Sequence, residues 1–196
     1  MASHEARRYR RKGLPKTARA LAAAVGGGTV LDIGGGVGNL SLELLERGAA
    51  RATVVEISDG YEDAAVELLA EHRLGDRVER RIGDFVAEAG LVDSHDVVVL
   101  HRVVCCYPDA DALVSAAASH SRRSLALTYP RERALTRVGF RIFNLWLRAT
   151  RCGFRTYVHP FATISAAAAK AGLELASRDP QGLVWENAVF ERPEAG

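Results

Sequence analysis

A carboxylate and four glycines stand close together in residues 30–40, VLDIGGGVGNL. Asp32 closes an apolar run, and Gly34, Gly36 and Gly38 follow it at alternate positions. Glycine tolerates backbone angles that other residues avoid and lets another group approach the backbone closely. This concentration therefore predicts a tight loop against a ligand, of the kind that follows the first strand in nucleotide-binding α/β domains.

The spacing of the glycines excludes two common nucleotide loops. A P-loop requires Gly-Lys-Ser/Thr after its glycines, and no such triplet follows here. The dinucleotide fingerprint Gly-x-Gly-x-x-Gly also fails, because its last position would be Asn39 when counted from Gly34 and Ser41 when counted from Gly36. The pattern that fits is hydrophobic-x-Asp-x-Gly-x-Gly-x-Gly. Gly35 lies outside its positions, and we assign it no role.

Two more carboxylates follow predicted strands. Glu56 lies near the end of the run ATVVEIS, and Asp84 follows the run RVERRI. Because the carboxyl ends of parallel strands meet at one edge of a sheet, we expect Asp32, Glu56 and Asp84 to lie close together. Each acid alone could be a helix cap, an ion-pair partner or a turn residue. The three together indicate a ligand site.

The elements that position these residues alternate between short β-rich runs and longer helical ones, which predicts a doubly wound α/β fold. The expected strands cover residues 29–34, 52–58, 77–85, 96–101, 124–130, 174–179 and 182–191, and the expected helices 16–25, 39–48, 61–75, 109–120, 133–150 and 162–172. A short turn joins the last two strands, so they must pair antiparallel. We expect a Rossmann-like seven-stranded sheet, mostly parallel with an antiparallel C-terminal hairpin.

The expected domain organisation is simple. Residues 1–25 form a basic arm and a helix, and residues 26–196 form one domain with a lid-like insertion at about 131–157.

The glycine motif and the three strand-end acids resemble class I S-adenosylmethionine (SAM) methyltransferases, over about residues 28–190. The resemblance implies methyl transfer from SAM, with S-adenosylhomocysteine (SAH) as product. It implies that Asp32 contacts the methionyl part, that Glu56 accepts the ribose hydroxyls, and that Asp84 accepts the adenine amino group with Phe85 beside the ring. The implied cofactor-binding positions are Asp32, Gly34, Gly36, Gly38, Glu56, Ile57, Asp84, Phe85 and His101.

The second half of the chain resembles magnesium-protoporphyrin O-methyltransferases and their small-molecule relatives. The shared features are an aromatic-rich insertion, the element Tyr157-Val158-His159, a helix at 162–171 and Gly182-Leu183. The segment HRVVCCYPD (101–109) departs from their sequence. We therefore carry over only a small-molecule acceptor and methylation at oxygen.

Three side chains could take a proton from an alcohol or phenol acceptor, whereas a carboxylate acceptor needs no base. His101 is the first candidate, because histidine titrates near neutrality and this one closes a central strand. Tyr129 at the end of the fifth strand and His159 after the insertion come next. In each case the alternative is a structural role, in which the side chain only forms a hydrogen bond with a loop.

Charge is segregated along the chain, although the formal net charge is only +2. Residues 1–19 hold seven Lys/Arg and one acid, and residues 122–155 hold nine Arg and one acid. These segments either are solvated faces or border a site for an anionic substrate or surface. Arg137, Arg141 and Arg148 share one side of an otherwise apolar helix. Such a helix suits a lid over the acceptor or an interfacial helix on an anionic membrane.

Composition limits the remaining classes. There is no apolar run long enough to span a membrane and no apolar leader, and three cysteines cannot form a disulfide framework, which favours the cytoplasm. Adjacent Cys105 and Cys106 are expected to fill small spaces. No metal site and no DNA partner are expected. Two alternatives stay open: an RNA methyltransferase, prompted by the basic segments, and a SAM-binding protein without methyl transfer.

Overall fold

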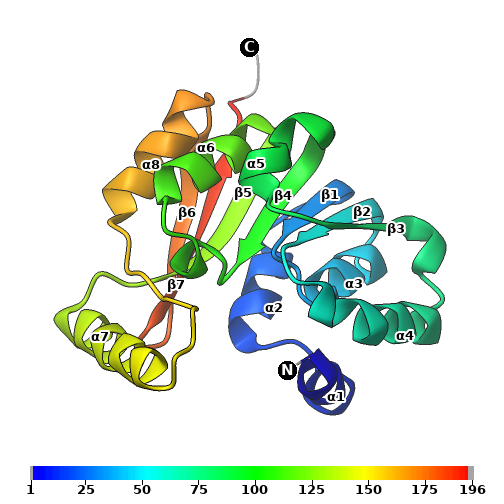
Figure 1. Cartoon of the computed structure of the whole chain (residues 1–196). Helices are drawn as coiled ribbons and strands as arrows, with labels where there is room; N and C mark the ends of the chain where they lie inside the picture. The colour runs from blue at the N-terminus through cyan, green and yellow to red at the C-terminus, as the bar shows by residue number, and fades with distance from the viewer. Residues whose placement is uncertain (1, 194–196) are drawn as a thin grey trace.

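The computed structural model describes residues 2–193. Its centre is a seven-stranded sheet with the order β3-β2-β1-β4-β5-β7-β6 (Figure 1). The strands are β1 (Gly28–Ile33), β2 (Ala49–Glu56), β3 (Val78–Ile82), β4 (His95–His101), β5 (Ser121–Pro130), β6 (Glu174–Gln181) and β7 (Trp185–Glu191). The α-helices are α1 (Ala2–Lys12), α2 (Lys16–Ala23), α3 (Asn39–Glu46), α4 (Glu62–His72), α5 (Phe85–Glu88), α6 (Ala110–Ser119), α7 (Ala134–Ala149) and α8 (Phe161–Lys170).

The strand directions confirm the predicted fold class. The first five strands pair in parallel, and β7 pairs antiparallel with both β5 and β6. Three strands start three residues away from the predicted position: β2 begins at Ala49 and β5 at Ser121, both earlier, and β7 begins at Trp185, later. In β2 and β5 one buried residue is followed by two exposed ones, among them Arg51, Arg122 and Arg123, which hides the strand start from an apolar pattern.

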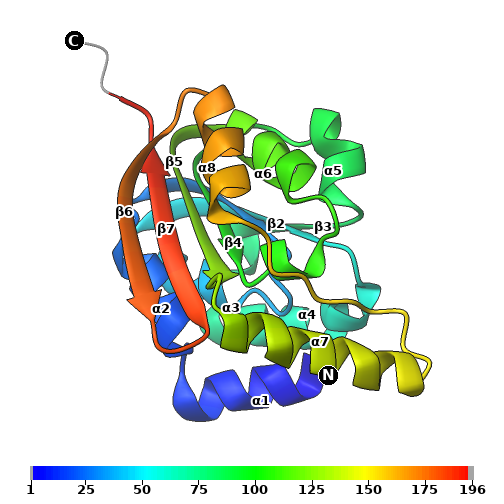
Figure 2. The ribbon, with the colours of Figure 1, turned by 90° about the vertical axis from the view of Figure 1, so that its left-hand side faces the viewer.

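Helices cover both faces of the sheet (Figures 1 and 2). Along β4, Val97 and Val99 pack toward α2, α3 and α4, whereas Val98 and Leu100 pack toward α5, α6 and α8. Burial on both faces explains why this strand is a continuous apolar run. Each such side chain contributes roughly 1.5–3 kcal/mol through burial, so the central strands form a rigid base for the loops at their ends.

Two helices outside these layers lie at the edge of the sheet where the parallel strands end. Both α1 and α7 follow this edge in the two views (Figures 1 and 2). Arg10 fixes α1 to α4 through ion pairs of 3.2 Å with Glu67 and 2.7 Å with Glu71. The helix α7 occupies the insertion between β5 and α8. Among residues 2–193 there is no helix long and apolar enough to cross a membrane.

Candidate active site

The glycine loop joins β1 to α3 with a backbone that only glycine adopts easily. Gly34, Gly36 and Gly38 have φ angles of +67°, +56° and +82°. The amide of Gly34 donates to the carbonyl of Val55 on β2, at 2.7 Å, so the loop is tied to the neighbouring strand. The residue types at these three positions therefore follow from the backbone itself.

Gly35 has a role that its place outside the motif did not reveal. A Cβ atom at this position would lie 2.7 Å from Val54 Cγ1 and 2.8 Å from Asp32 Oδ2. Both neighbours are fixed in the core, so neither can move aside cheaply. The extra glycine is required because the loop passes directly over β1 and β2.

Asp32 lies beneath the loop and is almost fully buried. Its Oδ2 accepts a hydrogen bond of 2.7 Å from the Ser41 hydroxyl on α3. Burial raises the pKa of Asp32 to about 6, and the hydrogen bond from Ser41 opposes this shift. Asp32 thus fastens the loop to the start of α3.

Glu56 closes the other side of the loop. Its Oε2 accepts from the Gly36 amide at 2.9 Å, and its Oε1 accepts from the Ser58 amide at 3.0 Å. One carboxylate therefore holds both the glycine loop and the turn after β2. Each oxygen retains a free lone pair for a further donor. Ile57, next in the chain, is 67% exposed at the same edge.

The third acid, Asp84, begins α5. Its Oδ1 accepts from the Val86 amide at 2.9 Å, and the Tyr107 hydroxyl lies 3.3 and 3.2 Å from its two carboxylate oxygens. Phe85 points into the core, with its ring packed edge-on against His120 at a centroid distance of 5.4 Å. The carboxylate of Asp84 is thus at the strand edge, while most of Phe85 is not open to a ligand.

The helix α1 supplies a residue that the sequence pattern did not indicate. Glu5 accepts a hydrogen bond of 3.4 Å from Asn39, and its carboxylate oxygens lie 3.5 Å from where a Cβ on Gly36 would be. Burial, and then the charge of Glu56, raise the pKa of Glu5. The N-terminal helix therefore covers the glycine loop. No spacing marks Glu5, which is the one acid of a basic segment.

An apolar cavity of about 720 Å³ lies beside this loop, between α7, the turn before β7 and the segment after β4. Its lining is Arg102, Cys105, Cys106, Arg133, Leu135, Thr136, Gly139, Phe140, Phe143, Phe154, Thr156, Leu183, Val184 and Trp185. The two cationic side chains are Arg102 and Arg133, and the lining contains no acid. The cavity is large enough for a small organic molecule.

Arg102 and Val103 connect the cavity to the glycine loop. The side chain of Val103 contacts Gly34 so closely that a Cβ there would lie 2.5 Å from Val103 Cγ2. Arg102 has a φ of +62°, and its guanidinium lies 4.5 Å from the centre of the Trp185 ring. Its Nη2 donates to Thr17 Oγ1 at 3.1 Å, and its buried Nε has no partner within residues 2–193. An unpaired buried donor is uncommon in a folded protein, and this one belongs to a residue that lines the apolar cavity.

The two adjacent cysteines also line the cavity instead of only filling space. Their Sγ atoms are 3.7 Å apart, and the Cys105 thiol donates to the Arg102 carbonyl at 3.3 Å. The contact with Cys106, together with burial, raises the pKa of Cys105, so this group stays a thiol. Both cysteines are free.

Comparison with known proteins relates part of the chain to a known family. Residues 30–124 match the family model described as a methyltransferase domain. The match covers just under half of the 196 residues, so this part of the chain is similar to methyltransferase domains. The predicted fold is confirmed, and the matches are to methyltransferases, in agreement with the predictions of a SAM-dependent methyltransferase and of SAM as the methyl donor. No curated protein matches the sequence.

Several solved structures share the fold of this chain at low sequence identity. Magnesium protoporphyrin IX methyltransferase from Synechocystis PCC 6803, crystallised with SAH, is 23% identical with a TM-score of 0.72, and the alignment covers 98% of this chain and 96% of that one. An O-methyltransferase family protein from Burkholderia thailandensis has a TM-score of 0.78 and 19% identity, over 100% and 59% of the chains. Mitomycin 7-O-methyltransferase has a TM-score of 0.69 and 24% identity, over 90% and 53%.

The three residues predicted to be catalytic do not gather in one place in the structure. His101 Nε2 lies 2.8 Å from Thr17 Oγ1, and burial lowers the pKa of this histidine to about 3. The Tyr129 hydroxyl donates to Glu186 at 2.7 Å inside the core, and His159 Nε2 lies 2.9 Å from the Tyr107 carbonyl. None of the three belongs to the cavity lining. His101 precedes a cavity residue, Arg102, in the chain.

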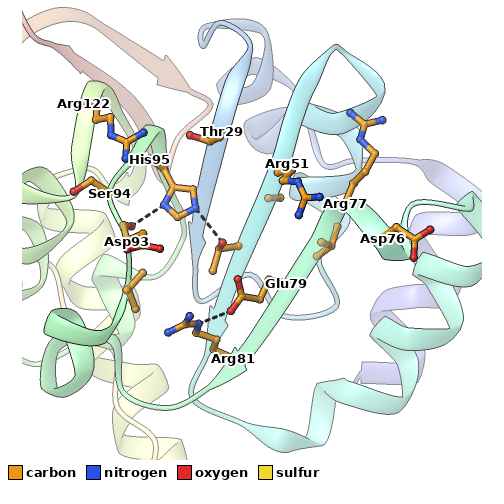
Figure 3. A pocket seen from close by; sticks show the side chains of 14 residues that line it. Thr29, Arg51, Asp76, Arg77, Glu79, Arg81, Asp93, Ser94, His95 and Arg122 are labelled. Carbon is orange, nitrogen blue, oxygen red and sulfur yellow. Dashed lines mark hydrogen bonds and ion pairs between the residues drawn. The ribbon is translucent and has the colours of Figure 1, made fainter.

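A second cavity, of about 790 Å³, lies at the opposite edge of the sheet, at the amino ends of β1 to β4 (Figure 3). His95 spans its wall, with Nδ1 2.8 Å from the Asp93 carbonyl and Nε2 3.0 Å from Thr53 Oγ1. Arg81 donates to Glu79 across its floor, at 2.8 Å. None of the predicted site residues lines this cavity, so we assign it no part in methyl transfer.

Proposed function

We propose that this chain methylates a small, largely apolar or aromatic molecule that bears an anionic group, with oxygen as the atom that receives the methyl. The observation that carries the proposal is the pair Arg102–Val103. Val103 contacts the glycine loop, and Arg102 lines the apolar cavity. The proposed methyl-donor site and the acceptor cavity therefore meet at two consecutive residues, Arg102 and Val103.

The residues around the loop fit SAM. The three left-handed glycines leave a backbone surface free of side chains, and Glu56 keeps two lone pairs for ribose hydroxyls. We propose that Asp84 accepts the adenine amino group, that Ile57 covers the adenosine, and that Asp32 acts by holding the loop against α3. SAM supplies an electrophilic methyl group on its sulfonium. Glu5 on α1 adds a further carboxylate next to Gly36.

The lining of the cavity supports the acceptor class. Phe140, Phe143, Phe154 and Trp185 offer flat apolar surfaces, and Arg102 and Arg133 offer positive charge without a competing acid. A carboxylate or phenolate suits this combination. The acceptor in the neighbouring mitomycin 7-O-methyltransferase is a small molecule, as its name states.

The positive charge also bears on how the acceptor loses its proton. A cation near a phenol or carboxyl group favours the ionised form and lowers its pKa. Arg102 can therefore hold the acceptor as its anion, and the rate gain then comes mainly from alignment of the reacting atoms. His101, with a pKa of about 3, is a neutral group that positions Thr17 and Arg102. The roles of His101, Tyr129 and His159 as bases stay predictions.

A cytoplasmic location and the absence of a DNA partner belong to the same proposal. All three cysteines are free thiols, which suits a reducing compartment. The alternative of an RNA acceptor finds less support in a cavity walled by Phe, Leu and Val side chains than a small apolar molecule does.

The test is an SAH-release screen over carboxylic and phenolic small aromatics, with Arg102→Met measured on the best acceptor. We expect kcat/KM to fall by about 10- to 100-fold, roughly 1.4–3 kcal/mol for a charged hydrogen bond, with little change in the SAM Kd. Arg151→Met is the matched control, because Arg151 also has a positive φ, of 56°, but does not line the cavity. Methylation of tRNA or rRNA in place of every small acid would overturn the proposal.

A further inference from the structure

The helix α7 exposes an unusual amount of apolar surface. Leu145 is 71% exposed, Ile142 65% and Trp146 58%. The exposed large apolar side chains of this helix, called here the α7 apolar face, are Leu135, Val138, Ile142, Phe143, Leu145 and Trp146. A contiguous patch of this size on one helix marks an interaction surface.

This face is not the side by which α7 packs on the domain. At 100° per residue, Thr136, Phe140 and Leu147 share a narrow side, and Thr136 and Leu147 are the buried residues of the helix. Asn144 anchors that side through hydrogen bonds of 2.7 and 2.8 Å with the backbone of Thr156. The α7 apolar face spans an arc of about 160° on the outside. Four residues of this face, Val138, Ile142, Leu145 and Trp146, are not part of the cavity lining, so closing the cavity would leave them exposed.

Positive charge borders the α7 apolar face. Arg137, Arg141 and Arg148 lie within about 40° of one another on its edge, and α7 contains no acid. Within residues 2–193, Arg141 and Arg148 have no ion-pair partner, and Arg137 pairs with Glu132 at 3.2 Å. The helix thus combines an apolar face with an adjacent row of cations.

The helix α1 adds positive charge along the same edge of the molecule (Figure 2). Its buried side consists of Ala2, Ala6 and Tyr9, and Arg10 pairs with α4, so the other cations of the helix are exposed to solvent. The outward cations are Arg7, Arg8, Arg11 and Lys12. One edge of the protein therefore presents an apolar helix and a basic helix together.

We propose that this edge docks on a membrane surface that contains anionic phospholipids, with the α7 apolar face at the boundary between headgroups and acyl chains. Cations beside a broad apolar face are the pattern of a helix that lies in the membrane interface. A second copy of the chain fits less well, because paired α7 faces would bring like charges together without an acid on either helix. RNA fits less well, because Leu, Ile and Val give bases no stacking surface.

Docking goes beyond the proposed function and does not depend on it, but the two meet at the cavity. Leu135 and Phe143 belong both to the α7 apolar face and to the cavity lining. A membrane-bound α7 would place the mouth of the cavity at the acyl chains. An apolar acceptor could then enter from the lipid without crossing water.

The test is co-sedimentation of the full chain with vesicles of phosphatidylcholine alone or mixed with phosphatidylglycerol. We expect binding to the mixed vesicles, weakened by salt, and little binding to pure phosphatidylcholine. The double variant Ile142→Glu/Leu145→Glu should lose at least tenfold in vesicle affinity, and Arg141→Gln/Arg148→Gln severalfold. Leu91→Glu is the matched control, because Leu91 is an apolar residue of similar exposure, 72%, away from α7.

Three results would overturn docking: no sedimentation with mixed vesicles, sedimentation that the α7 variants leave unchanged, or a concentration-dependent dimer that Ile142→Glu/Leu145→Glu dissolves while vesicles stay unbound. Circular dichroism and SAM binding by calorimetry check that the variants are folded. Because SAM binding and SAH release are read in vesicle-free buffer, failure of docking is separate from failure of the methyltransferase proposal.

Discussion

The glycine loop and the acceptor cavity share a wall at residues 102 and 103, but different interactions hold them. Around the loop, hydrogen bonds of 2.7–3.0 Å join Ser41 to Asp32, and the amides of Gly36 and Ser58 to Glu56. At the cavity, Arg102 has a buried Nε without a partner in the described chain, and the rest of the lining is mostly apolar. The donor side is a hydrogen-bonded network in which the buried Arg80 Nη1, 3.4 Å from where a Cβ on Gly38 would be, has no partner within residues 2–193, whereas the acceptor side is an open apolar cavity with two cationic side chains.

This difference has a consequence for substitutions. A hydrogen-bonded network in a densely packed core tolerates almost no added volume, because the surrounding side chains have no room to move. A cavity with spare capacity tolerates changes in size and responds to changes in charge. Substitutions that add volume therefore test the donor side, and substitutions that change charge test the acceptor side.

The largest effect is expected on the donor side, from Gly34→Ala. The new Cβ would lie 2.5 Å from Val103 Cγ2, and φ is +67°, so steric overlap and backbone strain add. We expect the SAM Kd to rise by about a hundredfold or more, corresponding to roughly 3 kcal/mol of overpacking and strain. Calorimetry with SAM measures this change.

Gly90→Ala is the control for that substitution, since nothing lies within 4 Å of a Cβ at Gly90. Its SAM affinity should equal that of the unmodified chain. Gly35→Ala, which meets Val54 and Asp32, should behave like Gly34→Ala although Gly35 lies outside the motif. A Gly35→Ala variant with normal SAM affinity would show that the loop has room that the structure does not indicate.

The donor side was also the more predictable one. Asp32, Glu56 and Asp84 follow three strands in chain order, and topology alone brings strand ends to one edge. Gly35 and Ser41 were not found, because their roles depend on which atoms pack above β1 and β2. The spacing of residues along the sequence does not show which atoms pack above these strands.

The acceptor side was found only in outline. An apolar helix with arginines predicted a lid, and α7 does form in the insertion. The cavity itself is built from segments around residues 102–106, 133–143, 154–156 and 183–185. No periodicity links segments so far apart. Arg102 shows the limit well, because its position over Trp185 depends on a left-handed φ that nothing in HRVVCC marks.

A smaller effect, on stability, is expected at the shared wall. Burial lowers the pKa of His101 from 6.5 to about 3, so between these values the unfolded chain binds a proton that the folded chain does not. Folding stability is therefore fully present above pH 6.5 and falls as the pH drops toward 3. The loss from His101 alone is about 2 kcal/mol at pH 5. Urea unfolding at pH 7 and pH 5 should show that His101→Gln removes it.

His95→Gln should remove a further part of the acid sensitivity, because burial lowers the pKa of His95 as well.

The same His101→Gln protein tests the mechanism. A positioning role predicts a moderate loss of turnover at neutral pH and an acceptor KM that changes with it. A general base would lose about 100- to 10,000-fold in kcat, and that outcome would restore the catalytic role to His101. An unchanged acid slope would mean that the ring is not shielded from water.

The smallest effect is expected where the two sides are weakly joined, at Tyr107 and Asp84. The Tyr107 hydroxyl is 3.2–3.3 Å from the carboxylate oxygens, near the long limit for a hydrogen bond. Tyr107→Phe should therefore weaken SAM binding only about two- to fivefold, or roughly 0.5–1 kcal/mol. Tyr157→Phe is the control, because within residues 2–193 the Tyr157 hydroxyl has no recorded hydrogen bond and the ring stacks on His159. If Tyr107→Phe instead costs as much as Gly34→Ala, then Asp84 is held by the acceptor side, and the donor network is less complete than its hydrogen bonds indicate.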